Sequence, residues 1–173
     1  MRIPTSTAIV AAVLSGCAAL SGWSVIMTGV PNPMRPAPMT PEESKSQVLK
    51  AAREVVAILG LDVVEASFWH SACNSRGDPP FRGRMRIGYP PAQSPRAADD
   101  QIAAMLDLLR AAGFSADSAF LSHAPALRKN DVIIVLRPQD PNATTRGVDV
   151  IGECRDVTTT IEDRGPVQSV VLD

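Results

Sequence analysis

The chain has 173 residues, of which 45% are hydrophobic but only 4% aromatic, so it has room for one globular domain with a mainly aliphatic core. Its 17 Lys and Arg residues nearly balance its 18 Asp and Glu residues, which leaves a net charge of −1 at pH 7. Nucleic-acid-binding proteins usually carry a strong basic excess, so this balance argues against nucleic acid as a partner.

The N-terminus predicts a lipoprotein signal peptide over residues 1–16. The apolar run Ala8–Leu14 is followed by the small residues Ser15 and Gly16 and then by Cys17. A run of this length suits a signal peptide and is too short for a transmembrane helix. Small residues let a signal peptidase seat an extended backbone beside the cysteine, whose sulfur first receives diacylglycerol. The alternatives are an ordinary secretory signal with an incidental cysteine and a cytoplasmic core segment.

Lipidation at Cys17 predicts a location at the cell membrane, on its extracytoplasmic side. Two or three acyl chains hold a protein stably on a bilayer, so the domain needs no membrane-binding face of its own. Residues 17–40 then form a tether, because their prolines favour an extended, polyproline-II-like backbone. We expect residues 41–173 to form a single folded domain beyond this tether.

The first half of that domain predicts one helix and two strands. Thr40 as N-cap, with Pro41 and Glu43 behind it, starts a helix that ends at Gly60. Residues 61–70 predict a strand, and the turn-forming residues 71–80 predict a loop. Residues 84–89 alternate, so that Met85, Ile87 and Tyr89 face inward while the arginines face outward.

The second half predicts a second helix and at least three strands. Ser94-Pro95 opens the helix and Gly113 closes it. Strands are expected over residues 115–122, 132–136 and 148–154, with residues 157–161 and 167–172 as weaker candidates. The order of elements predicts an α+β two-layer sandwich, in which a mostly antiparallel sheet has two helices on one face and water on the other.

Cys73 and Cys154 remain as a pair if Cys17 carries the lipid. An exported compartment allows such a pair to oxidise and persist, so we predict a structural disulfide. It would close a loop of about 80 residues and stabilise the fold by roughly 4.5 kcal/mol in the chain-entropy model. Two separate buried thiols are the alternative, as is a redox pair, although redox dithiols usually sit as Cys-x-x-Cys.

Four features together support a family resemblance: the Leu14–Cys17 lipobox, the aromatic strand and cysteine of Phe68–Cys73, the helix ending at Gly113-Phe114, and the strand Gly147–Cys154 ending in Gly-x-Cys. With these features the chain resembles the LppA-like lipoproteins of mycobacteria and their relatives over most of residues 41–160. It departs from them in its long Pro-rich tether and its short loop after Cys73. The resemblance implies an exported, lipid-anchored α+β domain with a disulfide, and it carries no established chemistry and no catalytic residues.

No motif in the sequence indicates a particular reaction. His70 and His123 lack metal-ligand spacing, and a metal site would need both to converge with a carboxylate such as Asp78 or Glu153. There is no Gly-x-Ser-x-Gly nucleophile elbow and no Gly-rich phosphate loop. We therefore predict no catalytic, cofactor-binding or metal-binding residue.

An arginine cluster, with Arg76 in the loop and Arg82, Arg84 and Arg86 along a strand, is the most suggestive group of side chains. Arginines that alternate on one strand face suit an anionic lipid headgroup, a cell-wall polymer or an acidic protein partner. The alternative is an ordinary solvated strand face.

These observations favour a lipid-anchored extracytoplasmic domain that binds a protein, lipid or cell-wall partner in the envelope and catalyses nothing. One alternative is a hydrolase-like envelope enzyme whose site is built from loop residues such as His70, Asp78 and His123. Another is a structural or immune-exposed surface protein without a specific ligand.

Overall fold

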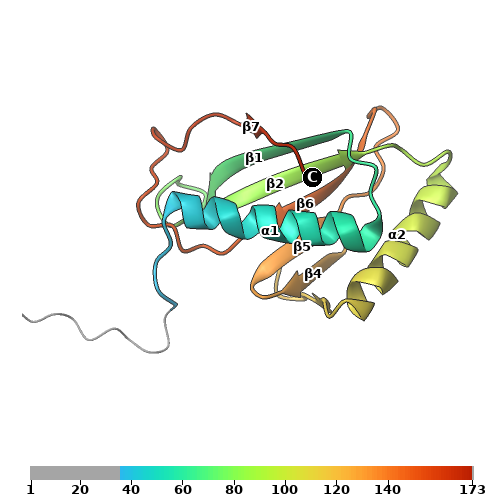
Figure 1. Cartoon of the computed structure of the whole chain (residues 1–173), viewed down its shortest axis with the longest axis horizontal. Coiled ribbons are helices and arrows are strands. Elements are labelled where there is room, and N and C mark those ends of the chain that lie inside the picture. The colour runs from blue at the N-terminus through green and yellow to red at the C-terminus, as the bar shows by residue number, and fades with distance from the viewer. Residues whose placement is uncertain (1–35, 173) are drawn as a thin grey trace, which may run out of the picture. The chain divides into compact units, whose positions relative to one another are not determined.

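The structure, a computed structural model, describes residues 36–172 (Figure 1). The predicted signal peptide, Cys17 and most of the tether therefore lie outside the described residues, and those predictions stay predictions. The described part contains two helices and seven strands: α1 Pro41–Leu59, β1 Glu65–Ala72, β2 Phe81–Tyr89, α2 Pro95–Ala111, β3 Ser115–Ala116, β4 Ala126–Lys129, β5 Val132–Leu136, β6 Arg146–Ile151 and β7 Gln168–Ser169.

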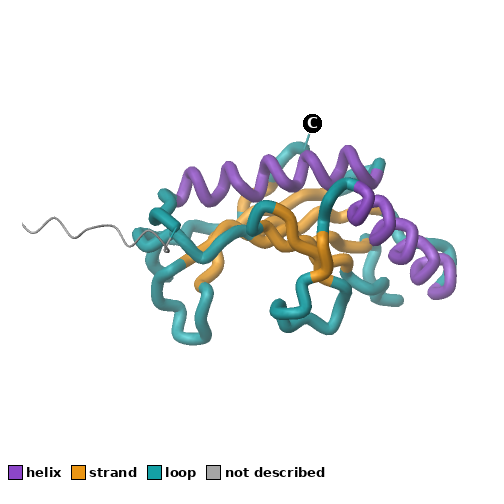
Figure 2. Tube along the Cα trace, turned by 90° about the horizontal axis from the view of Figure 1, so that it is seen from below, coloured by secondary structure: helices purple, strands orange, loops and turns teal. Residues whose placement is uncertain are grey.

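The strands form one open sheet in the order β3-β4-β5-β6-β2-β1-β7, in which every neighbouring pair is antiparallel. Both helices lie on the same side of this sheet (Figure 2). Their buried residues join those of the strands in one core cluster, to which α1 contributes Val48 and Val55 and α2 contributes Met105 and Leu109. The predicted α+β fold, with two helices on one face of an antiparallel sheet, is confirmed.

The predicted helix starts are also observed. The Thr40 side chain accepts from the backbone N–H of Glu43 at 3.1 Å, and the Glu43 carboxylate accepts from the Thr40 N–H at 2.8 Å. This capping box satisfies two backbone donors that the first turn of a helix leaves unpaired. α1 then crosses β2 so closely at Gly83 that a Cβ there would lie 2.6 Å from the Ser44 carbonyl oxygen. Only glycine at this position lets α1 pack against the sheet.

The structure shifts the predicted limits of the first two strands. β1 begins at Glu65 rather than at residue 61, and Val64 is 61% exposed. It continues to Ala72, because its partner β2 begins at Phe81, three residues before the predicted start. The additional residues of β2 bring Arg82 into the sheet.

The predicted strand over residues 115–122 is wrong beyond Ala116. The Asp117 carboxylate accepts hydrogen bonds from the backbone N–H groups of Ala119 and Phe120, at 3.1 and 3.2 Å, which turns the chain out of the sheet. Residues 117–125 form a loop instead, and the strand that follows, β4, was not predicted.

The predicted strand over residues 148–154 ends early, at Ile151. Residues 157–161 form no strand, because Asp156 accepts from the backbone N–H groups of Thr158 and Thr159, both at 3.0 Å, and bends the chain. The weak candidate at residues 167–172 contains the two-residue edge strand β7.

The two faces of the sheet differ in what covers them. The helices cover one face, which carries Met85 and Ile134 from its central strands. The other face, here called the open face, has a smaller buried cluster of Ile133, Val135 and Ile151, against which Phe120 and Ala124 of the 117–125 loop pack. The rest of the open face, over β1, β2 and β6, carries charged side chains.

Candidate binding site on the open face of the sheet

Strand alternation places the three predicted arginines together on the open face. Phe81, Met85 and Ile87 of β2 are buried on the helix side, so Arg82, Arg84 and Arg86 project from the opposite side. In β1, the residues that pair with these arginines are, in the same order, Ser71, Trp69 and Ser67. On the other side of β2, strand β6 places Asp149 directly opposite Arg86.

Asp149 is the central carboxylate of this face, and its side chain is only 5% exposed. Arg86 binds it most closely, with Nε 2.8 Å from Oδ1 and Nη2 3.3 Å from Oδ2. Arg137, which directly follows β5, donates to Oδ2 from 3.4 Å, and Nη2 of Arg84 lies 3.7 Å from the same oxygen. One carboxylate therefore serves three guanidinium groups.

Trp69 supports two of these arginines from the neighbouring strand. The guanidinium carbon of Arg84 lies 5.5 Å from the centroid of the Trp69 ring, and that of Arg86 lies 6.0 Å away. Within about 6 Å of the face of an indole, a guanidinium is attracted by the ring quadrupole. The tryptophan and Asp149 thus hold the arginine side chains in place from opposite sides.

Arg82 and Arg84 are the least satisfied members of the cluster. Among the described residues Arg82 forms no ion pair, and the buried Nε atoms of both side chains have no hydrogen-bond acceptor. Burial lowers the pKa of Arg82, and the neighbouring Arg84 lowers it further. Burial also lowers the pKa of Arg84, although Asp149 opposes the shift. The Arg86 pKa is instead raised, chiefly by its hydrogen bond to Asp149.

The cluster leaves a net positive surface on a chain whose overall charge is −1. Its cations are Arg82, Arg84, Arg86 and Arg137, and the described carboxylates beside them are Asp149 and Glu65. We refer to these four arginines with Trp69 and Asp149 as the arginine face. Arg76, the fourth predicted arginine, lies apart in an exposed loop, where its Nε is 3.2 Å from Oδ2 of Asp78.

His70 lies on the opposite, helix-covered side of the sheet. It is buried, its ring stacks edge-on against Phe68 with 4.9 Å between centroids, and its Nδ1 is 3.8 Å from Oδ2 of Asp156. Burial lowers the His70 pKa, whereas the Asp156 charge opposes that shift. Burial alone would raise the Asp156 pKa, but hydrogen bonds from Thr159 and Thr158 outweigh it and the pKa is lowered.

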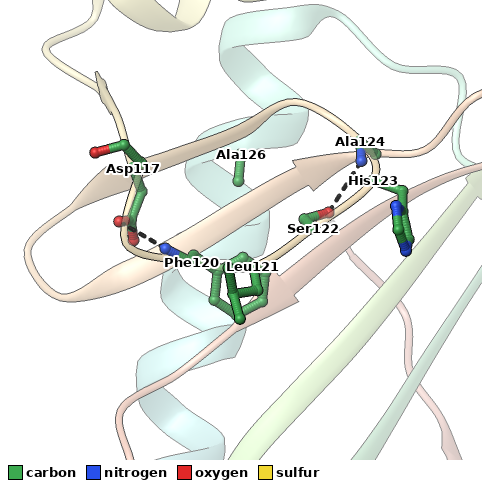
Figure 3. A pocket seen from close by; sticks show the side chains of 8 residues that line it. Asp117, Phe120, Leu121, Ser122, His123, Ala124 and Ala126 are labelled. Atoms are coloured by element: carbon green, nitrogen blue, oxygen red, sulfur yellow. Dashed lines mark hydrogen bonds between the residues drawn. The ribbon is translucent and has the colours of Figure 1, made fainter.

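His123 lines a hollow of about 420 Å³ in the 117–125 loop (Figure 3). Its ring lies at the opposite end of the loop from Asp117, whose carboxylate is held by Arg128 through a 2.8 Å hydrogen bond from Nε. The walls between them come mainly from Phe120 and Leu121. None of the other residues that line the hollow therefore offers His123 a free acid or base.

The alternative enzyme site does not assemble in the part of the chain described. His70 and His123 lie on opposite faces of the sheet, and Asp78 is in the exposed loop with Arg76. Glu153 accepts from Gln47 at 2.7 Å. No group of three or more His, Cys, Asp or Glu side chains suited to a metal ion occurs within residues 36–172.

The predicted disulfide between Cys73 and Cys154 is present in the structure, with 6.0 Å between the Cα atoms. Cys73 follows β1 and Cys154 follows β6, the two strands that flank β2 in the sheet. The bond therefore joins the sheet at the end from which β2, with its three arginines, begins.

Sequence reasoning missed three members of the arginine face: Trp69, Asp149 and Arg137. Asp149 interrupts the apolar run Val148–Ile151, and a charged residue inside a buried strand is a signal for an ion pair. Arg137 directly follows the apolar strand Val132–Leu136. Neither signal predicts which residue forms the ion pair, because that depends on which strands are neighbours in the sheet.

The fold and the arginine face define a class of protein: an antiparallel α+β domain with helices on one face of its sheet and a cationic surface on the other. Neither of its helices is long and apolar enough to cross a membrane, judged over the described residues. No solved structure is significantly similar to the chain.

Residues 40–173 match the family model for the "Putative lipoprotein LppJ", and the chain belongs to this family. A relative with this name in Mycobacterium bovis is 36% identical over 84 residues, which cover 47% of this chain and 44% of the relative. One in Mycobacterium tuberculosis strain CDC 1551 is 33% identical over 94 residues, covering 51% of this chain and 50% of the relative. These matched segments span about half the length of the curated relatives.

The comparison confirms the predicted resemblance at the level of a mycobacterial lipoprotein family. The family that matches carries the name LppJ, a different member name from the LppA-like lipoproteins to which the sequence features pointed.

Proposed function

We propose that this protein is a lipoprotein anchored by diacylglyceryl Cys17 on the extracytoplasmic side of the cell membrane, where its domain binds an anionic partner of the envelope without catalysing a reaction. The lipoprotein name of the family supports the anchor, as does the lipobox at residues 14–17. The Cys73–Cys154 disulfide fits an oxidising compartment outside the cytoplasm.

The observation that carries the binding role is the imbalance of charge on the arginine face. Four arginines share this surface with two carboxylates, and Asp149 alone bridges three of them. Without a partner, such a cluster is unfavourable, because its like charges repel and its half-buried guanidinium groups lose hydration. An anionic partner supplies the missing charge.

The anchor is tested by mass spectrometry of the mature protein. We expect an N-terminal Cys17 that carries diacylglycerol, and we expect Cys17→Ser to lack this lipid and to keep residues 1–16, because cleavage follows lipidation. An unmodified N-terminus downstream of residue 17 would contradict the anchor.

The binding role is tested with the unlipidated Cys17→Ser protein, sedimented with isolated cell envelopes at increasing salt. We expect binding that weakens with salt and that falls severalfold in the double variant Arg82→Gln/Arg137→Gln, because counterions and lost arginines both reduce the electrostatic attraction. The matched control is Arg53→Gln/Arg96→Gln, which removes two exposed arginines from the helices. Equal loss in both variants would show that the arginine face is not the binding surface.

A further inference from the structure

Arg82 and Arg84 differ from the other arginines of the open face in having donors to spare. Arg86 places two of its nitrogens within 3.3 Å of Asp149, and Arg137 reaches the same carboxylate at 3.4 Å. Arg84 has only a 3.7 Å contact with it, and Arg82 has no ion pair among residues 36–172. The lone acidic side chain at the centre of the face is therefore already occupied by other arginines.

The Nε atoms of Arg82 and Arg84 are buried and donate to no acceptor in the described part of the chain. A guanidinium withdrawn from water without an acceptor is unfavourable, and an added anion relieves that penalty. Arg146 also has such an Nε, but its side chain is 2% exposed on the helix-covered side, where no ligand reaches it. The Arg84 side chain is 28% exposed, so its fork remains accessible.

The spacing of the two side chains suits one oxyanion. Alternate residues of a strand project from the same face about 7 Å apart, so two guanidinium forks converge on a group that lies between them. A carboxylate offers only two oxygens, both in one plane, and its closest contact is with a single fork, as Arg86 and Asp149 show. A phosphate group offers three or four oxygens and accepts from both forks at once. All four cations are arginines, whose fork binds an oxyanion such as phosphate through two nitrogens.

We propose that Arg82 and Arg84 form a binding site for a phosphate group, with the Trp69 ring as the wall that fixes Arg84. The phosphate belongs either to a phospholipid headgroup or to a soluble phosphate. This inference rests on the proposed binding role of the arginine face, but it does not depend on the lipid anchor.

Trp69 provides a direct reporter, because Trp23 is the only other tryptophan in the chain. The experiment uses the full chain carrying Cys17→Ser and Trp23→Phe, which leaves Trp69 as the only tryptophan, with its ring centroid 5.5 Å from the guanidinium carbon of Arg84. One arm titrates inorganic phosphate against sodium chloride at matched ionic strength. The other arm titrates phosphatidylglycerol vesicles against phosphatidylcholine vesicles. We expect a saturable change in Trp69 fluorescence with phosphate or with phosphatidylglycerol that the two controls do not produce.

Arg82→Gln/Arg84→Gln should weaken this binding by tenfold or more, since each lost charged hydrogen bond reduces affinity by about that factor. Arg82→Lys/Arg84→Lys keeps both charges but loses the forks, and we expect it to weaken binding severalfold. The matched control Arg53→Gln/Arg96→Gln should bind as the parent does. Circular dichroism establishes that each variant is folded before it is compared.

The pattern of responses decides the source of the phosphate. Saturation with vesicles alone assigns a lipid headgroup, and saturation with inorganic phosphate assigns a soluble phosphate. The proposal is overturned if neither arm saturates, or if the folded glutamine variant binds as tightly as the parent. If envelope sedimentation still depends on the arginine face in that case, the partner carries a different anion and the proposed function stands. If phosphate binds but envelopes do not, the phosphate site stands and the proposed envelope-binding role fails.

Discussion

The arginines on the two faces of the sheet differ in their partners and in their exposure. On the helix-covered face, Arg146 is fully enclosed and is held by neutral partners: the Gln101 side-chain oxygen at 2.5 Å, the Ala98 carbonyl at 3.2 Å, and the Tyr89 ring 5.5 Å from its guanidinium carbon. No carboxylate pairs with it among the described residues. This arginine ties α2 to the first residue of β6, so its role is structural.

On the open face, by contrast, the arginines surround Asp149 and keep part of their surface in water. A buried cation with neutral acceptors stabilises packing but meets no ligand. A half-exposed cation near a shared carboxylate retains hydrogen-bond donors for a ligand. This difference supports our proposal that the helix-covered face provides stability and the open face binds a partner.

The largest expected effect comes from removing the disulfide, on which both faces depend. The Cys73→Ala/Cys154→Ala variant opens a covalent loop with a sequence separation of 81. We expect it to lower the free energy of unfolding by about 4.5 kcal/mol, because the unfolded chain regains the entropy of that loop. Urea denaturation measures the change, and reduction of the parent protein with dithiothreitol should reproduce it. A midpoint unchanged by both treatments would contradict the structural role of this bond.

Two neighbouring residues of β5 lie on opposite faces of the sheet, so substituting each of them compares the packing of the two faces. Ile134 lies in the core beneath the helices, whereas Ile133 lies under the 117–125 loop. We expect Ile134→Ala to cost about 4 kcal/mol and Ile133→Ala about 2 kcal/mol, because a loop collapses into a cavity more easily than packed helices do. Chemical denaturation of both variants measures the difference. Equal losses, or a larger loss for Ile133→Ala, would show that the loop packs as tightly as the helices.

The central carboxylate of the arginine face is tested by Asp149→Asn. We expect a loss of about 2 kcal/mol in the free energy of unfolding, since three arginines lose their shared counter-charge. Added salt should restore part of it by screening the repulsion between them. The matched control is Asp107→Asn, which breaks an exposed 3.1 Å pair with Arg110 and should cost at most about 0.5 kcal/mol. A salt-independent loss at Asp149 would contradict the electrostatic explanation.

The smallest expected effect is a pH dependence on the helix-covered face. The folded state holds the His70 pKa below its ordinary value of 6.5, chiefly through burial. Below pH 6.5 the unfolded state therefore binds the proton more readily, and stability falls as the pH decreases. Denaturation midpoints between pH 7.5 and pH 5 should decline in the parent protein, and His70→Gln should flatten that decline. His123→Gln removes the other histidine, and a decline that vanished in this variant instead would reassign the effect.

Several parts of the structure are encoded locally and were predicted from the sequence. The capping residues Thr40 and Ser94 start both helices, because a side chain in each contacts a backbone N–H only three residues away. The alternation in residues 84–89 already assigns Arg84 and Arg86 to one side of a strand, because the period of a strand is two.

The turn between β4 and β5 also has a local signal in the sequence. Asn130 and Asp131 both have positive φ angles, of 47° and 62°, in the tight turn that joins β4 to β5. Residues of this kind favour the two-residue turn of a hairpin, and they would have predicted β4 before the apolar strand Val132–Leu136.

By itself, the sequence determined the two capped helices, the strand periods and the side of β2 on which its arginines lie, and its residues 14–17 carry the pattern that predicts a lipid anchor. Only the tertiary structure decided that Asp149 stands among those arginines, that Arg137 joins them, and that Arg82 and Arg84 retain unused donors. The physical reason is that caps and strand periods depend on neighbours in the chain. The balance of charge on a sheet face depends instead on strand order and register, which pair residues of β2 and β6 that lie 57 to 67 positions apart in the chain.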